Sequence, residues 1–135
     1  MNTFKLSILT PEGEIYCGDA VSVIAPGIDG SFGIWANHAP MMAALGIGEI
    51  IYRTPDGESV EIAVAGGMLE VSNNAVSLLA DVAELPERID LNRAQRALDR
   101  AQTRLNSHDL EIDYERARLA MLRALNRINI LKKDK

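Results

Sequence analysis

The sequence predicts two parts of different class: an N-terminal β-sandwich of about ten short strands, followed by a C-terminal antiparallel two-helix hairpin (β + α). Three observations support this. Up to residue 85, short β-branched and apolar segments alternate with Gly, Pro and Asn turns. From residue 89 on there is neither glycine nor proline, and Ala, Leu and Arg dominate. Leu85-Pro86-Glu87-Arg88 separates the two patterns, so we expect domains at 1–85 and 86–135.

The strands are predicted from alternating polarity and from turn residues. Residues 3–9 alternate apolar and polar side chains, as in a half-buried strand. Pro55-Asp56-Gly57 is typical of a hairpin turn. Gly66-Gly67 interrupts a strand and indicates a bulge or a close approach of two backbones. The expected strands cover residues 3–9, two segments within 14–25, 32–34, 47–54, 59–65, 68–71 and 75–83.

The helices are predicted from two apolar seams. In the first, leucine recurs every seven residues with alanine between, and the second repeats at spacings of four and three. Asn106-Ser107-His108-Asp109 is a natural break between them, so the helices are expected to pack antiparallel. The seam residues are Leu91, Ala94, Leu98, Ala101 and Leu105, then Ala117, Met121, Ala124, Ile128 and Leu131.

Asp90 stands where the first helix is expected to begin. Its carboxylate can accept the free N–H groups of the first turn, which is the role of an N-cap. Arg93 follows three residues later on the same side of that turn. The pair is consistent with a cap beside a solvated arginine, and equally with half of a small polar binding site.

Charge is divided unevenly along the chain. Residues 1–85 carry two basic and eleven acidic side chains, and residues 86–135 carry twelve basic and eight acidic, for a net charge of −5. Such a split suggests that the two halves bind different partners, or each other.

Several classes of function are not supported. Cys17 is the single cysteine, which leaves no intrachain disulfide and no cysteine-based metal site. His38 and His108 lie in different parts of the chain, so no metal site is expected. Aromatic residues make up 4%, too few to favour nucleic-acid stacking. No phosphate loop, dinucleotide fingerprint or nucleophile elbow occurs, and we expect no catalytic residue. The charge-free run from Gly30 to Gly48 contains four glycines and a proline, which argues against a membrane span.

Arginines form two stripes on the predicted helices. Guanidinium groups bind phosphate bidentately, so two stripes bordering one groove could make a small nucleotide site without a phosphate loop. Alternatively, these faces are solvated or meet an acidic partner. The stripes are Arg93, Arg96, Arg100 and Arg104, then Arg116, Arg123 and Arg127.

Short segments along the whole chain match those of a known family. In the first part they are Thr10-Pro11-Glu12-Gly13, Phe32-Gly33-Ile34, His38-Ala39-Pro40, residues 65–71, residues 76–80 and Ala83-Glu84. In the second part they are Ile89-Asp90-Leu91-Asn92-Arg93-Ala94, Asp113-Tyr114-Glu115-Arg116-Ala117 and Arg123-Ala124-Leu125-Asn126-Arg127. Each segment is weak alone, but together, in this order and at this length, they are highly specific. Over essentially its whole length the chain therefore resembles the epsilon subunit of the F-type ATP synthase.

The resemblance implies a non-catalytic subunit of a rotary central stalk. The sandwich would bind the gamma subunit and the ring of c subunits. The hairpin would lie folded, or extend into the alpha/beta catalytic head and inhibit ATP hydrolysis. The chain would be peripheral, reaching the cytoplasmic face of a cell inner or thylakoid membrane only through the complex. Residues expected to face the ring or gamma are Ser31, Trp35, His38, Met41 and Met42; here Ser31, Trp35 and Ala36-Asn37 depart from the family's usual residues.

The resemblance also implies ATP as a regulatory ligand, with no cofactor required. In some bacterial members an Ile/Leu-Asp-x-x-Arg-Ala motif and arginines of the second helix bind ATP, which favours the folded hairpin. Carried onto this chain, the positions are Ile89, Asp90, Arg93 and Ala94, supported by Glu84, Arg100, Arg116, Arg123 and Arg127. The competing hypothesis is a stand-alone ATP-sensing adapter, which would form no stable complex with gamma.

Overall fold

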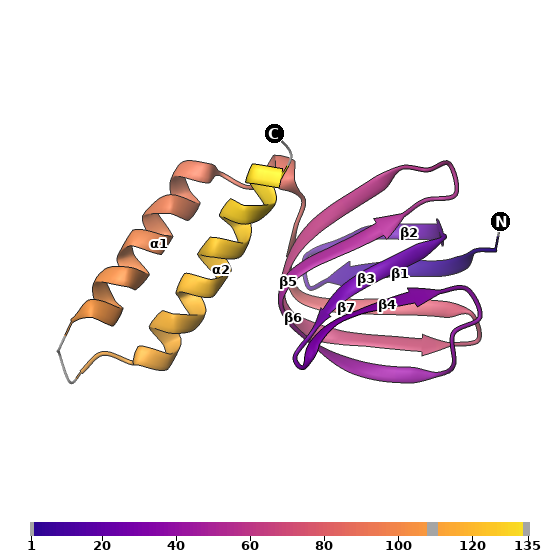
Figure 1. Cartoon of the computed structure of the whole chain (residues 1–135), viewed down its shortest axis with the longest axis horizontal. Coiled ribbons are helices and arrows are strands. Elements are labelled where there is room, and N and C mark those ends of the chain that lie inside the picture. Colours follow the sequence, from indigo (N-terminus) through magenta and orange to yellow (C-terminus); the bar gives the residue numbers. More distant parts are fainter. Residues whose placement is uncertain (1, 108–110, 134–135) are drawn as a thin grey trace. The chain divides into compact units, whose positions relative to one another are not determined.

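The computed structural model describes residues 2–107 and 111–133, which form seven strands, one short 3-10 helix and two α-helices (Figure 1). The chain divides into two compact units, Met1–Leu85 and Pro86–Lys135, and each is described by itself. The elements are β1 (Phe4–Thr10), β2 (Gly13–Ala20), β3 (Ser22–Gly27), β4 (Gly30–Trp35), β5 (Met41–Arg53), β6 (Ser59–Ser72), β7 (Ala75–Glu84), η1 (Pro86–Arg88), α1 (Leu91–Asn106) and α2 (Tyr114–Lys133).

The first unit is one continuous sheet with strand order β2-β1-β7-β6-β5-β3-β4. Two long strands, β5 and β6, belong to both of its halves. Residues 41–45 pair with 67–71 in the half that β7 and β1 extend, and residues 47–53 pair with 59–65 in the half that β3 and β4 extend. The sheet folds over between these halves, as the ribbon shows (Figure 1).

The core of this unit is apolar and lies between the two halves. Along β1 the inward positions are Phe4, Leu6 and Ile8, all buried, so the alternation predicted for residues 3–9 is confirmed. Each fully buried aliphatic side chain contributes about 1.5–3 kcal/mol to folding. The other strands add Ala20, Val23, Ala25, Ile34, Leu45, Ile50, Tyr52, Ile62, Val64, Leu69, Val71, Val76, Leu78 and Ala80.

Two glycines, Gly66 and Gly67, allow β6 to bend and to approach β7 closely. Gly67 has φ +135°, and a Cβ there would lie 2.2 Å from the carbonyl oxygen of Leu79, so the expected close approach of two backbones is confirmed. The pair is a bend inside one strand, because β6 continues from Ser59 to Ser72. β5 likewise starts at Met41, six residues before the strand expected at 47–54, and the described strands number seven where about ten were predicted.

The second unit is the predicted antiparallel hairpin. Ala94 and Leu98 of α1 and Ala124 and Ile128 of α2 form its small core. Leu91, which was expected in the seam, is mostly on the surface because it begins the helix outside that cluster. Ser107 caps the end of α1 by donating its backbone N–H to Arg104 O at 3.2 Å, whereas His108 and Asp109 lie outside the described residues.

Candidate functional site

Asp90 begins α1 and caps it. Its backbone is extended, with φ −86° and ψ 109°, and its Oδ1 accepts a hydrogen bond of 3.1 Å from the backbone N–H of Arg93. The predicted N-cap is therefore confirmed. The cap fixes the backbone of Arg93 relative to the carboxylate, and the exposed Arg93 side chain projects from the first turn.

Antiparallel packing brings the start of α1 beside the second half of α2. Ala94 belongs to the same core as Ala124 and Ile128, so Arg93 and Arg127 lie toward one end of the hairpin. The Ala94 side chain is 3% exposed and is used in helix packing, so a contact between it and a ligand would be limited. Arg127 and Arg123 are half-buried, whereas Arg93 is exposed.

The predicted ATP-binding arginines extend along the whole hairpin. Arg116 precedes Arg127 by eleven residues, which is about 16 Å along a helix axis at about 1.5 Å per residue. Arg100 lies between these levels on the exposed side of α1. The set therefore forms a long basic border that an elongated anion could follow.

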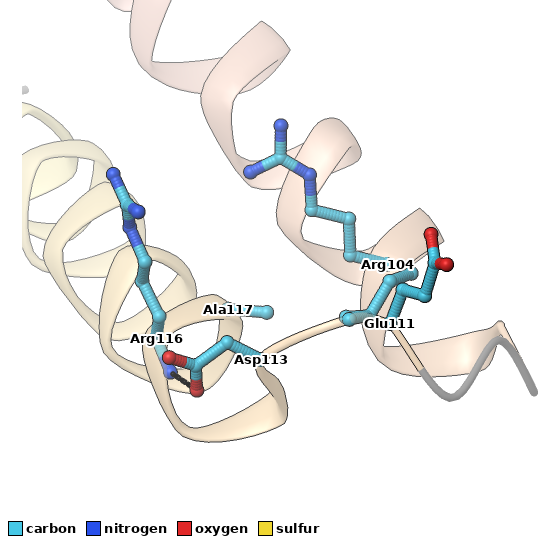
Figure 2. Close-up of a pocket in the computed structure, with 6 residues that line it drawn as sticks. Arg104, Glu111, Asp113, Arg116 and Ala117 are labelled. Carbon is cyan, nitrogen blue, oxygen red and sulfur yellow. Dashed lines mark hydrogen bonds between the residues drawn. The ribbon is translucent and has the colours of Figure 1, made fainter.

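A cavity of about 360 Å³ lies at the end of the hairpin where α2 begins. Figure 2 shows Arg104 reaching from α1 and Arg116 from α2, with the two guanidinium groups well apart. The carboxylates of Glu111 and Asp113 also border it, so the positive and negative charges of its lining are balanced. Its lining residues are Arg104, Glu111, Ile112, Asp113, Arg116 and Ala117.

Of these residues, Arg104 and Arg116 belong to the predicted arginine stripes, and only Arg116 was assigned to the ATP-binding set. A signal was present for Asp113, because Asp113-x-x-Arg116 repeats the spacing of Asp90-x-x-Arg93. The geometry also repeats, since Asp113 Oδ1 accepts from the N–H of Arg116 at 3.0 Å. Glu111 lines the same cavity as Arg104 of α1, and no local pattern in the sequence predicts that the two residues meet.

The remaining predicted residues lie in the first unit. Glu84 ends β7, and its membership in the nucleotide site stays a prediction. Ser31 and Trp35 are exposed on β4, and Trp35 keeps 58% of its surface accessible. His38 has its Nδ1 2.7 Å from the carbonyl oxygen of Ala39. Met41 packs against the core and Met42 points outward, as neighbours on a strand do.

Sequence reasoning missed an apolar strip on the outer face of the sheet, which we call the outer strip. Register places Leu9, Leu79, Met68 and Ala44 side by side on four neighbouring strands. Ile28 extends the row, because its N–H donates to Ala44 O at 3.1 Å. Leu79 is 54%, Met68 40% and Ile28 67% exposed. Contiguous exposed apolar surface of this kind is typical of a protein interface.

Two family profiles together account for almost the whole chain. Residues 3–86 match the beta-sandwich domain of the ATP synthase delta/epsilon chain, and residues 87–132 match its long alpha-helix domain. The chain belongs to the ATP synthase delta/epsilon family. The resemblance to the epsilon subunit and the predicted fold class are thereby confirmed.

Curated relatives support the epsilon type. The ATP synthase epsilon chain of Syntrophomonas wolfei is 42% identical over 98% of this chain and 96% of its own length. That of Desulfitobacterium hafniense is 46% identical over 94% and 95%. The chain is thus an epsilon-type subunit of the F-type complex. None of the helices in the described parts is long and apolar enough to cross a bilayer.

Solved structures show the same fold at low identity. A chain of the Euglena gracilis mitochondrial ATP synthase, in an OSCP/F1/c-ring structure, superposes with a TM-score of 0.87 at 18% identity, covering 97% of this chain and 82% of the other. A chain of the Tetrahymena thermophila enzyme's central stalk and c-ring gives 0.57 at 14% identity, covering 96% and 94%.

Proposed function

We propose that the first unit is a rigid base that binds the gamma subunit and the c-ring, and that the hairpin is a non-catalytic regulatory arm. The arm lies folded, or extends into the alpha/beta catalytic head and inhibits ATP hydrolysis. The chain reaches the cytoplasmic face of the membrane only through this complex. The outer strip, with Trp35 and Met42, offers the apolar surface that such a base needs.

The observation that carries this proposal is the contrast between the two cores. Seventeen buried apolar residues form the core of the sheet, whereas seven are buried in the described parts of the helices, four of them alanine, and four of the seven form the shared cluster. A helix pair with so little buried surface opens at low free-energy cost, which suits an element that exchanges partners.

The proposal is tested in an F-type complex prepared without this subunit. Adding the full chain or residues 1–85 should restore assembly and ion-driven ATP synthesis, because both carry the base. Only the full chain should lower ATP hydrolysis. Equal hydrolysis with both would contradict the regulatory arm, and failure of both to assemble would favour the stand-alone adapter.

We further propose that ATP binds along the basic border of the folded hairpin, with Asp90, Arg93 and Arg127 as contacts. At one hundred times its dissociation constant, ATP would stabilise the folded state by about 2.7 kcal/mol. Calorimetric titration of the full chain should show one-to-one binding that is lost in Arg93→Ala and Arg127→Ala. Arg118→Ala is the matched control, because Arg118 is exposed on α2 and paired with Glu115 at 2.6 Å. Unchanged affinity in the first two variants would refute the site.

A further inference from the structure

β4 is an open edge of the sheet. In the described part of the chain it pairs with β3 alone, and β2 forms the opposite edge. An edge strand presents unpaired backbone N–H and C=O groups along one side. Its role therefore depends on which residues present those groups and on what surrounds them.

Pro26 identifies the outward-facing groups. It stands opposite Ser31 in the β3–β4 ladder, and proline has no N–H to contribute to a hydrogen-bonded pair. Hydrogen-bonded and non-bonded pairs alternate along an antiparallel ladder, so Gly30, Phe32 and Ile34 bond to β3. Ser31, Gly33 and Trp35 then direct their N–H and C=O groups away from the sheet.

The two edges differ in protection. β2 carries Glu14 and Asp19, the latter paired with Lys5 at 2.6 Å, and its register with β1 shifts between Ile8 and Leu9. Charges and irregularities of this kind discourage strand addition. β4 has neither: it lies in the charge-free run from Gly30 to Gly48, and its register with β3 is unbroken.

Trp35 gives this edge an apolar wall. Its ring lies over Gly33, where a Cβ would be 2.7 Å from both Cζ3 and Cη2 of the indole and 3.8 Å from Ile24 Cγ1. Trp35 and Ile24 are both partly exposed. A strand added beside β4 would bury the indole, and a charged side chain placed there would lose water without gaining a counter-ion.

We propose that β4 accepts an extended, uncharged segment of another subunit, which adds to the sheet as an eighth strand. That this other subunit belongs to the F-type complex rests on the proposed function. Affinity comes from main-chain hydrogen bonds to Ser31, Gly33 and Trp35, and the Trp35 ring selects against charge.

The test is residue-resolved hydrogen exchange of the isolated chain and of the chain assembled in the F-type complex, quenched before analysis. The amides of Ser31, Gly33 and Trp35 should exchange at least tenfold more slowly in the complex. Those of Phe32 and Ile34, already bonded to β3, should change little. If exchange slows equally at all five amides, the partner covers β4 with side chains and does not pair with it as a strand, which overturns the proposal. The proposal is also overturned if exchange slows at none of them.

A pair of variants at Ser31 tests the hydrogen bond from its outward N–H to the added strand. Ser31→Pro removes an outward N–H and leaves the bonds to β3 in place, so its affinity for the complex should fall at least tenfold. Ser31→Ala removes the hydroxyl but keeps the outward N–H, so its affinity should fall clearly less than that of Ser31→Pro. If the wild type fails to assemble, the proposed function fails; if it assembles and Ser31→Pro binds equally well, only the eighth strand is refuted.

Discussion

Two aspartates begin the helices of the hairpin and use their carboxylates in the same way. Asp90 accepts from the N–H of Arg93 at 3.1 Å, and Asp113 from that of Arg116 at 3.0 Å. The first role of each Asp-x-x-Arg sequence is therefore to cap a helix. The cap also fixes the backbone of each arginine, so a ligand would meet side chains that begin from a fixed position.

Removing the cap should loosen the first turn of α1. Asp90→Ala costs about 1 kcal/mol, roughly a fivefold rise in opening of that turn, measured by amide exchange of residues 92–95. Asp90→Asn keeps a capping oxygen and should exchange like the wild type. If Asn also keeps ATP affinity, the negative charge is not needed for binding. Unchanged exchange in the alanine variant would contradict the cap.

Burial of Tyr52 predicts a loss of stability at high pH. Its ring packs 4.6 Å from that of Tyr16, and burial raises the pKa of the Tyr52 phenol above its usual 10.0. The folded state thus favours the neutral phenol, and this contribution is present below about pH 10 and lost as the pH rises through the folded-state pKa.

Tyr52→Phe should therefore flatten the fall of the unfolding free energy above about pH 10. Denaturant titrations of both proteins at a series of pH values measure it. The two slopes should agree near neutral pH, where neither phenol ionises. Equal slopes above pH 10 would show that another group governs the alkaline transition.

At the scale of elements, the Gly66-Gly67 pair marks a bend inside β6 rather than the end of a strand. Gly67 and Gly13 have almost the same φ, +135° and +137°, but a Cβ at Gly67 meets Leu79 O at 2.2 Å and one at Gly13 meets nothing within 4 Å. An alanine at Gly13 would therefore suffer backbone strain alone, whereas one at Gly67 would suffer the same strain and also collide with β7.

Gly13→Ala should cost about 1–3 kcal/mol from backbone strain alone. Gly67→Ala should cost clearly more, because β6 and β7 would have to move apart. Denaturant unfolding of the two variants gives the difference directly. Equal losses would mean that the sheet absorbs the displacement easily.

Local patterns in the sequence predicted much of the fold. Alternation located β1, and the cap at Asp90 and the seam at Ala94 and Leu98 located α1. The number of strands was wrong because a Gly-Gly pair gives the same signal for a turn and for a bend within β6. The outer strip was missed because it depends on the register of β1 with β7, which are remote in sequence.

At the scale of the whole molecule, the two units have separate cores. The core of the first unit includes residues of β1 through β7, and the partly buried apolar residues packed against it end at Leu85. Its stability should therefore come mainly from residues before Pro86.

A chain of residues 1–85 should fold cooperatively, with dispersed amide signals matching those of the full chain. The fragment 86–135 should show weak, non-cooperative helicity, because four of the seven residues buried in its described parts are alanines, which bury little surface. Circular dichroism melts and amide spectra of both fragments measure this. A sharp melting transition in the second fragment would contradict it.

The parallel pairing of β1 with β7 joins the first and last strands of the sheet. During synthesis, β1 has no permanent neighbour on that side until residue 79 has been added to the chain. The following residues, Pro86–Lys135, then take about 3–10 s to add at about 5–20 residues per second. The last strand of the sheet is therefore complete several seconds before the last residues of the arm are added.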